Sequence, residues 1–313
     1  MAWTQTLEAW DLLDSARASG ERVAAVLRAR GAECRVTTTT GERGSTDFIR
    51  AVFPGLRGRT AGGEARTLGL IGRLGGIGAR PDRIGLVSDA DGAITAIACA
   101  LKVADMRREG DPLPGDVIVA THVCPRAFIH QTPTVPMMMS PVDIATMNTH
   151  EVDPGMEAIL SVDTTRGNRV VNHKGIAISL PVKEGYILRA MDAMLDIYQW
   201  VTGIPPVIVP LATQDITPYG TGLRHINSIL QPSTATAAPV VAVALTAEVP
   251  VPGSATGASQ AGDIETAVRF CLEVAKAYGA GTCDFYDQKE FDELLGRFGP
   301  MRHLQTHGQA VPM

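Results

Sequence analysis

Two carboxylates, Asp89 and Asp91, lie between a predicted strand, residues 84–88, and a predicted helix, residues 93–109. In open α/β sheets, ligands bind at the edge where strands end and helices begin. The free N–H groups and the dipole of a helix N-terminus also favour negative charge there. Each carboxylate could instead be an ordinary N-cap, since aspartate is a preferred capping residue. The pair therefore has a chemical interpretation and a purely structural one.

Two further predicted strands lead to polar side chains that can bind a metal ion. Residues 116–121 lead to His122, and residues 158–163 end in Asp163. With Asp89, these side chains form a carboxylate and imidazole set that suits zinc, manganese, cobalt or nickel. A zinc ion held in this way lowers the pKa of bound water to ~7 and polarises a carbonyl group. Strand-end aspartates are also common in turns, and a single histidine is often structural, so both interpretations stay open.

Cys124 and Arg73 are further candidates for chemistry. The Cys124 thiolate could act as a nucleophile if His122 or another base activated it. A buried and inert thiol is the alternative. Arg73 lies in the glycine-rich segment 67–78. Its guanidinium could bind a substrate carboxylate through two hydrogen bonds or replace the charge of a metal ion. A surface arginine on a loop is the alternative.

Two glycine-containing segments differ in what they predict. Segment 67–78 is not a phosphate loop, because no helix directly follows its glycines. The polar segment that begins at Thr213 follows a predicted strand, residues 205–210. This segment resembles the place where the co-catalytic metal exopeptidases keep a substrate-contacting Thr-Asp segment, and the resemblance implies that Thr213 and Asp215 bind substrate; His225 is a further candidate. An ordinary Gly/Pro turn is the alternative for the first two.

Alternating strands and helices must position these side chains. Predicted helices cover residues 7–30, with a break near 18–20, and 93–109, 185–201 and 263–278; predicted strands cover 34–53 as a pair, a short run from 67, 84–88, 116–121, 158–163, 175–179, 205–210 and 239–245. This order predicts an α/β fold with a mainly parallel central sheet covered by helices on both faces. We expect a single domain, residues 1–296, and a C-terminal tail, residues 297–313.

Composition limits the classes of partner. The chain has 313 residues, 45% of them hydrophobic, and a net charge of −5, so it can bury a substantial core. No basic patch stands out, which argues against nucleic acid and anionic membrane. No signal peptide or apolar run of transmembrane length is visible, so a cytoplasmic location is expected. The five cysteines have no zinc-ribbon spacing.

Self-association is a further expectation from the sequence. Residues 126–157 are too long for an ordinary connection and predict a functional or interface loop. The apolar run Met137–Met139 lies within it. We expect a homo-oligomer formed through this loop or through the tail.

The order of elements over residues 8–279 resembles that of the co-catalytic metal exopeptidases. These are the glutamyl-aminopeptidase type and its leucyl-aminopeptidase and carboxypeptidase relatives. The resemblance implies a phosphorylase/hydrolase-like α/β fold of the zinc-exopeptidase kind. Asp89 resembles the aspartate that bridges two metals in that clan, with Asp91 as its rival. Asp163 resembles a later aspartate ligand.

Three positions depart from the pattern of that clan. The His-x-Asp motif is replaced by residues 73–75, Arg-Leu-Gly. The Glu-Glu position falls on residues 122–125, so the usual general base is missing. The final histidine would fall within residues 253–260, which contain none. The resemblance therefore implies at most two or three surviving metal ligands.

The chain is also similar to an uncharacterised bacterial family known only as domain of unknown function 1177. The stretches that carry this similarity are Gly-Arg-Leu-Gly-Gly-Ile-Gly (72–78), Val-Ser-Asp-Ala-Asp-Gly (87–92), Ser-Val-Asp-Thr-Thr (161–165) and Thr-Gln-Asp-Ile-Thr-Pro-Tyr-Gly (213–220). This family implies no established reaction.

Together these features predict a diverged metal-dependent hydrolase of a small peptide- or amide-like substrate. One divalent metal, zinc foremost, would be held by Asp89, Asp163 and His122. His122, Cys124 and Asp91 are the candidate catalytic residues. The alternative is a metal-free small-molecule-binding or assembly protein that keeps the exopeptidase fold.

Overall fold

The computed structural model describes residues 1–15, 17–73, 86–125, 127–131, 136–165, 170–212, 226–249, 251 and 257–307. The helices are α1 (Trp3–Leu13), α2 (Gly20–Ala29), α3 (Asp91–Arg108), α4 (Ile144–Glu151), α5 (Asp192–Thr202), α6 (Ala261–Ala280) and α7 (Gln288–Phe298), with the 3-10 turns η1 (Arg59–Ala61), η2 (Ser88–Ala90), η3 (Ser228–Thr234) and η4 (Arg302–Leu304). The strands are β1 (Glu33–Gly41), β2 (Gly44–Phe53), β3 (Leu68–Gly72), β4 (Val117–Val123), β5 (Phe128–Gln131), β6 (Pro136–Met139), β7 (Ala158–Thr164), β8 (Gly175–Ile178), β9 (Val182–Lys183), β10 (Tyr186–Ile187) and β11 (Val240–Thr246).

The central sheet is mixed, with a parallel core. Its nine strands within the described residues run in the order β1-β2-β4-β3-β7-β11-β9-β10, and β8 also pairs with β11. Strands β4, β3, β7 and β11 are parallel neighbours, while β1, β2 and β8 join antiparallel. The central strands are buried along their whole length, as expected for parallel strands covered on both faces. The predicted α/β class is confirmed.

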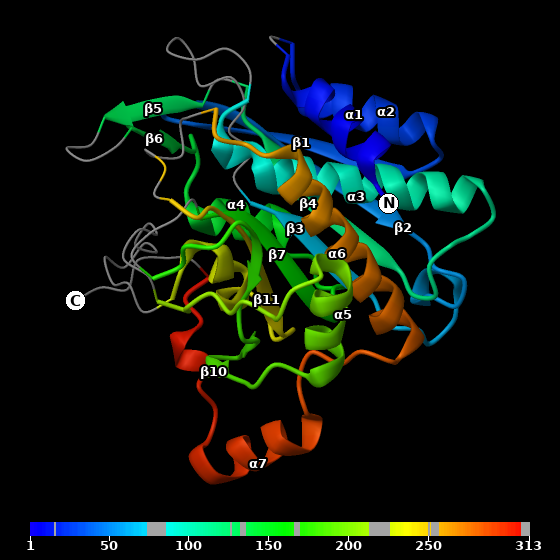
Figure 1. Ribbon diagram of the computed structural model, residues 1–313, viewed down its shortest axis with the longest axis vertical. Helices are drawn as coiled ribbons and strands as arrows, with labels where there is room; N and C mark the ends of the chain where they lie inside the picture. Colours follow the sequence, from blue (N-terminus) through cyan, green and yellow to red (C-terminus); the bar gives the residue numbers. More distant parts are fainter. Residues whose placement is uncertain are drawn as a thin grey trace.

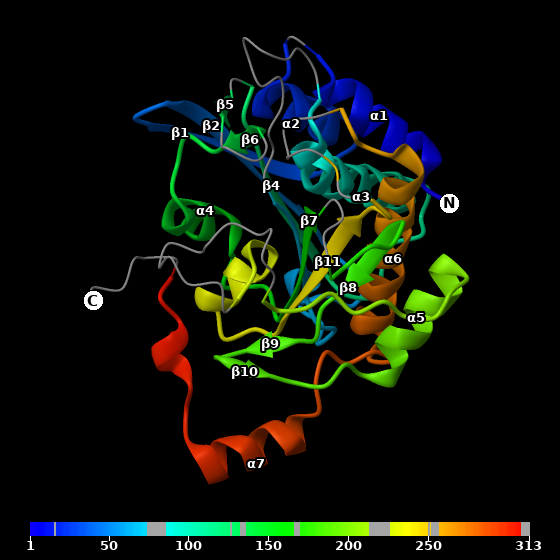
Figure 2. The same cartoon turned by 60° about the vertical axis from the view of Figure 1, so that its left-hand side comes forward.

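Helices cover both faces of this sheet. Helices α1, α2, α3, α5 and α6 lie over one face, and α4 and η3 lie over the other (Figures 1 and 2). A hydrophobic core lies on each face of the sheet. Alternate residues of the central strands pack into one core or the other, because side chains alternate between the two faces of a strand. On β4, for example, Val117 and Val119 face the larger helical layer, whereas Ile118 and Ala120 face the side of η3.

Helix α3 fixes the position of the Asp89–Asp91 segment. Its start lies directly against the ends of β3 and β7. A Cβ atom on Gly92 would come within 2.5 Å of the carbonyl oxygens of Arg73 and Val162, so only glycine permits this approach. The carboxylates before and at the start of α3 are therefore held beside the carboxyl ends of two central strands.

Several predicted elements are confirmed, and the others differ for local reasons. Residues 34–53 form the β1–β2 hairpin, and Ser19 caps α2 by accepting a hydrogen bond from the Arg22 N–H. The predicted strand 205–210 is wrong, because only Ile208 makes an isolated bridge. Prolines at 205, 206 and 210 supply no N–H groups for a ladder.

Two more predictions need correction. Residues 185–201 are not one helix, since the short strand β10 precedes α5. Of the predicted strand 84–88, the structure describes residues 86–88: Leu86 makes a β-bridge, and Ser88 begins the 3-10 turn η2. Residues 126–157 are not a single irregular loop either. They contain β5, β6 and α4, and Asp143 caps α4 by accepting from the Thr146 N–H.

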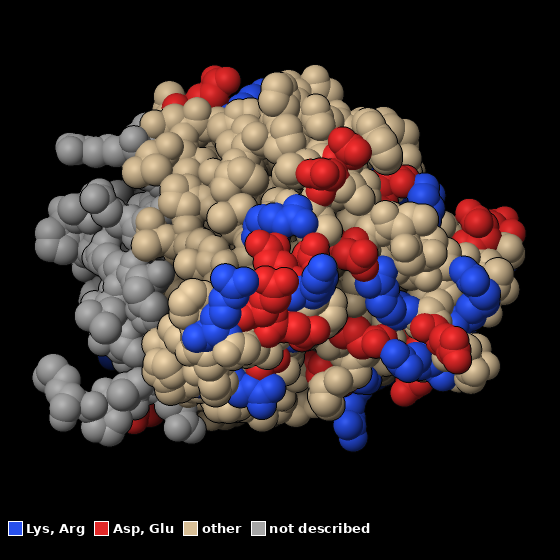
Figure 3. All heavy atoms as spheres, turned by 90° about the horizontal axis from the view of Figure 1, so that it is seen from below, with Lys and Arg blue, Asp and Glu red and all other residues tan. Residues whose placement is uncertain are grey.

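The C-terminal segment reaches back to the main body. Helix α7 projects beyond the β9–β10 strands (Figures 1 and 2). The Gln305 side chain then donates hydrogen bonds to the carbonyl oxygens of Ser233 and Thr236, at 2.8 and 2.6 Å. The face seen in Figure 3 carries intermixed acidic and basic side chains rather than a patch of one sign. Within the described residues, no helix combines the length and hydropathy needed to cross a membrane.

Candidate functional site

Register places three of the predicted residues in one row. Gly72 of β3 pairs with Thr121 of β4 and with Val162 of β7. The next residue in each case, Arg73, His122 or Asp163, therefore comes level with the other two. Because side chains alternate along a strand, all three project to the α4 side of the sheet. The sheet thus brings together three residues that the sequence singled out separately, Arg73, His122 and Asp163.

Glu151, the last residue of α4, joins two members of this row. Its Oε1 lies 2.5 Å from Nδ1 of His122, and its Oε2 lies 3.0 Å from Nε of Arg73. The Arg73 side chain is 1% exposed and that of Glu151 is fully buried. An ion pair in such surroundings interacts far more strongly than one in water.

The remaining nitrogens of Arg73 are also occupied. Nη2 donates to Oδ1 of Asn148, and Nη1 donates to Oε1 of Gln231 at 3.3 Å. The interpretation of Arg73 as a surface residue on a loop is wrong, because β3 delivers it into the interior. A substrate carboxylate could bind this guanidinium only by displacing partners that it already has.

Asp163 of the row and Asp89 are a second pair of buried, electrostatically coupled groups. They are 2% and 4% exposed, respectively. Burial and the nearby Asp163 charge raise the pKa of Asp89 well above its usual range. Burial raises the pKa of Asp163 to about 7, although the Thr164 N–H, which donates to its Oδ1 at 2.7 Å, and the charge of Arg73 oppose this rise. Oδ2 of Asp89 is buried and has no hydrogen-bond partner among the described residues.

The capping interpretation fails for both aspartates of the 89–91 segment. The N-cap of α3 is Ala90, which makes no side-chain cap, and Asp91 is the first helical residue. The Asp91 carboxylate instead accepts a hydrogen bond from the Ser259 hydroxyl. Its negative charge in the first turn still suits the helix dipole.

The predicted ligand set of Asp89, Asp163 and His122 does not form a metal cluster in the described part of the chain. No group of three or more His, Cys, Asp or Glu side chains is placed there to hold a metal ion. Arg73 lies between His122 and Asp163 in the row, and Nδ1 of His122 faces Glu151. The strand position of Arg73 thus separates His122 from Asp163, and its charge disfavours a metal ion bound by both.

Cys124 lies in apolar surroundings that favour the inert interpretation. It is 2% exposed and packs in a small cluster with Val87, Ala127 and Met138. Its thiol donates a weak hydrogen bond to the Ser45 carbonyl oxygen, at 3.6 Å. The candidate substrate contacts Thr213, Asp215 and His225 lie outside the described residues.

Glu151, Asn148 and Gln231 were missed by sequence reasoning. Asn148 and Glu151 are three residues apart, a spacing that puts both side chains on one face of a helix. The signal was available only after α4 had been recognised, and residues 126–157 gave no clear helical pattern. Gln231 comes from η3, far away in the sequence.

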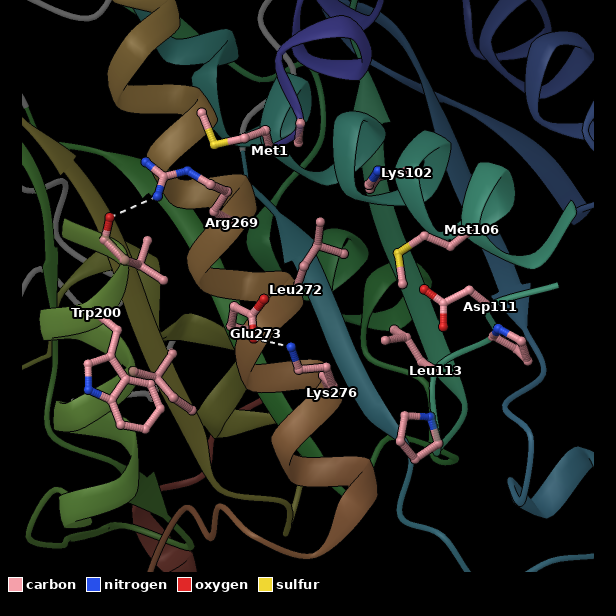
Figure 4. Close-up of a pocket in the computed structure, with 15 residues that line it drawn as sticks. Met1, Lys102, Met106, Asp111, Leu113, Trp200, Arg269, Leu272, Glu273 and Lys276 are labelled. Carbon is pink, nitrogen blue, oxygen red and sulfur yellow. Dashed lines mark hydrogen bonds and ion pairs between the residues drawn. The ribbon is translucent and has the colours of Figure 1, made fainter. Parts of the chain in front are cut away.

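A separate groove lies on the other side of the sheet, between α3, α5 and α6 (Figure 4). Its volume is about 660 Å³. Figure 4 shows Trp200 on one side and Met106 and Leu113 on the other. Lys102, which also lines it, is eleven residues along α3 from Asp91, or about 16 Å at 1.5 Å per residue. The groove is therefore distinct from the buried carboxylates.

The fold defines the class of protein: a mixed α/β chain with a zinc-exopeptidase-like fold. A crystal structure of Macrostomum lignano glutaminyl cyclase is similar, with a TM-score of 0.50, 12% identity and coverage of 89% of each chain. A mutant tomato leucine aminopeptidase has a TM-score of 0.48 and 12% identity, over 86% of this chain and 60% of that one. Residues 37–308 match the family described as a protein of unknown function (DUF1177), and the chain belongs to this family. No curated protein matches the sequence.

Proposed function

We propose that this protein is a hydrolase of a small peptide- or amide-like substrate and uses one divalent cation, zinc foremost, at Asp89 and Asp163. The observation that carries the proposal is a pair of buried carboxylates, Asp163 near the end of β7 and Asp89 in the turn η2 before α3. Asp89 has an oxygen without a hydrogen-bond partner among the described residues, and each carboxyl has a raised pKa. Such a pair suits a cation, which would offset both the burial and the repulsion.

The resemblance of the sequence to metal exopeptidases supports the substrate class. That resemblance, read from the order of elements in the sequence, implies that Asp89 and Asp163 stand at metal-ligand positions. When bound, the cation would lower the pKa of a water molecule and polarise the substrate carbonyl. Arg73 favours the carboxylate form of Asp163, and the Thr164 N–H fixes one oxygen of that carboxylate.

The first experiment is to measure bound metal in untagged protein by elemental mass spectrometry. We expect about one equivalent of zinc, manganese, cobalt or nickel per chain, a count set by the single site proposed here. Asp89→Asn and Asp163→Asn should each lose this equivalent, because an amide oxygen is a weaker ligand than a carboxylate. Asp196→Asn makes the same change on the exposed side of α5 and should retain the metal.

Two outcomes would count against this function. Wild-type protein that stays metal-free after incubation with these ions would exclude it. Metal that persists in Asp163→Asn would place the ion elsewhere. With a metal-loaded protein, hydrolysis of short peptides and simple amides is then measured for the wild type and for Asp196→Asn.

A metal-free binding or assembly role is the second candidate. The clamped Arg73 favours it, because a fixed guanidinium already supplies positive charge to the strand ends. A metal-free wild type together with saturable binding of a small molecule would support this role.

A further inference from the structure

We propose that the groove between α3, α5 and α6 is a binding site for a small apolar carboxylate, whose anionic group is held by the Lys102 ammonium. The groove is separate from Asp89 and Asp163. The proposal therefore goes beyond the proposed function and does not depend on it.

Apolar side chains from three helices line the groove. On α5, Ile197 and Trp200 are three residues apart, and on α3, Lys102 and Met106 are four apart. Residues at these spacings share one side of a helix. Figure 4 shows Leu272 of α6 between Trp200 and Met106. Trp200 is 77% exposed, so most of its ring surface is open to contact with a ligand.

Lys102 is the charged group best placed to select that ligand. Residues 91–101 of α3 are all buried, and Lys102 is the first residue of this helix that is partly exposed. Its side chain makes no ion pair or hydrogen bond with the part of the chain that the structure describes. An ammonium held partly out of water beside apolar groups loses hydration, and an anionic ligand would replace what it loses.

The other charged side chains that line the groove are paired or exposed. Arg269 contacts Glu265 at 2.8 Å, and Lys276 contacts Glu273 at 2.5 Å. Asp111 is exposed, so water and salt screen its charge. The half-buried ammonium therefore sets the sign of charge that the groove favours in a ligand.

The groove has the size of a small-molecule site rather than that of a protein interface. Its volume of about 660 Å³ lies within the roughly 300–1,000 Å³ of ligand pockets. It is lined by 15 residues, whereas a stable protein interface uses roughly 20–30 residues on each side. We therefore expect a small acid, with its apolar part against Trp200 and Leu272 and its carboxylate at Lys102.

Titration calorimetry with octanoate tests this site. We expect octanoate to bind the wild type saturably, and octylammonium, which has the same chain length and the opposite charge, to bind at least about tenfold more weakly. Lys102→Met removes the charge and keeps the apolar stem. It should weaken octanoate binding by about tenfold and abolish the preference between the two probes. Trp200→Ala removes one apolar wall and should also weaken octanoate binding.

Lys289→Met is the matched control. Lys289 is exposed on α7, outside the groove, and its side chain has no ion pair among the described residues. This variant should bind octanoate as the wild type does. Neither Lys102 nor Trp200 is buried, so both groove variants should fold, as circular dichroism would show. If Lys102→Met is insoluble, Lys102→Gln is measured in its place.

Three results would overturn the proposal: no saturable binding of octanoate to the wild type, unchanged binding in the Lys102 variant, or tighter binding of octylammonium than of octanoate. A second copy of the chain is the competing occupant. Analytical ultracentrifugation that showed a wild-type dimer, dissociated by Trp200→Ala, would make the groove a surface of self-association and would also overturn the proposal.

Discussion

Glu151→Gln tests the buried network directly. The substitution preserves shape and one acceptor oxygen but removes the negative charge that faces Arg73. That arginine would then be a buried cation with neutral amide partners on Asn148, Gln231 and the new glutamine. His122 would also lose the carboxylate that faces its Nδ1.

The size of the effect follows from burial. Removing one partner of a buried ion pair costs about 3–5 kcal/mol. The glutamine can still accept a hydrogen bond, so we expect the lower end, about 3 kcal/mol. Against a typical unfolding free energy of about 5–15 kcal/mol, this is a substantial loss. At about 2.1 cal/mol/K of unfolding entropy per residue, it corresponds to a fall in Tm of roughly 5 °C for a chain of 313 residues.

Urea unfolding followed by circular dichroism measures this loss. Glu293→Gln is the matched control, because it breaks the exposed i,i+4 pair with Arg297 on α7. That change should cost no more than about 0.5 kcal/mol. The double variant Arg73→Met with Glu151→Gln leaves no unpaired charge between the two positions. It should therefore cost at least about 1 kcal/mol less than the sum of the two single variants.

The reasoning would be refuted if Glu151→Gln and Glu293→Gln had the same small effect. It would also fail if the double variant were strictly additive, because additivity would mean that the two charges do not interact in the folded protein.

Two further predictions concern the start of α3. The raised pKa of Asp89 means that the folded state binds more protons than the unfolded state above about pH 4, so its contribution to stability falls as pH rises. In chelator-treated protein, the urea midpoint of Asp89→Asn minus that of the wild type should increase as the pH rises from 4.5 to 8. A difference that stays constant over this range would contradict the prediction. Gly92→Ala should cost about 1–3 kcal/mol by pushing α3 from β3. Gly296 has open space around it, so Gly296→Ala should stabilise α7 by about 0.5–1 kcal/mol. If Gly92→Ala and Gly296→Ala changed the stability equally, the close contact of Gly92 with β3 and β7 would be refuted.

The residues at the strand ends could be predicted, because their positions depend on local pattern. A buried apolar run that stops at a polar residue predicts the end of a strand, and the carboxyl ends of parallel strands share an edge. His122 and Asp163 were identified in this way. The order in which strands neighbour one another has no such local signal. Arg73 therefore could not be placed between His122 and Asp163 until β3 was seen between β4 and β7.

The partners of these residues could not be predicted, for the same reason. Glu151 belongs to a short helix whose apolar pattern is weak, since only Met147, Asn148 and Glu151 of α4 are buried. Glu151 matters because it contacts Arg73, at the end of β3, and His122 of β4, which are far from it in the sequence. Gln231 reaches Arg73 across a separation of 158 residues. The sequence thus indicated which polar side chains come to this edge of the sheet but not which of them are already paired.

The charge of Arg73 and that of the proposed cation have different physical consequences. Arg73 is covalently part of the chain, so the row of β3, β4 and β7 is neutralised as soon as the chain folds. A cation at Asp89 and Asp163 can leave, and the raised pKa values of these carboxyls allow protons to take its place. Folding therefore does not require the exchangeable ion, whereas the proposed hydrolysis would. With such an ion bound, one sheet edge would combine a permanent structural charge with a replaceable one.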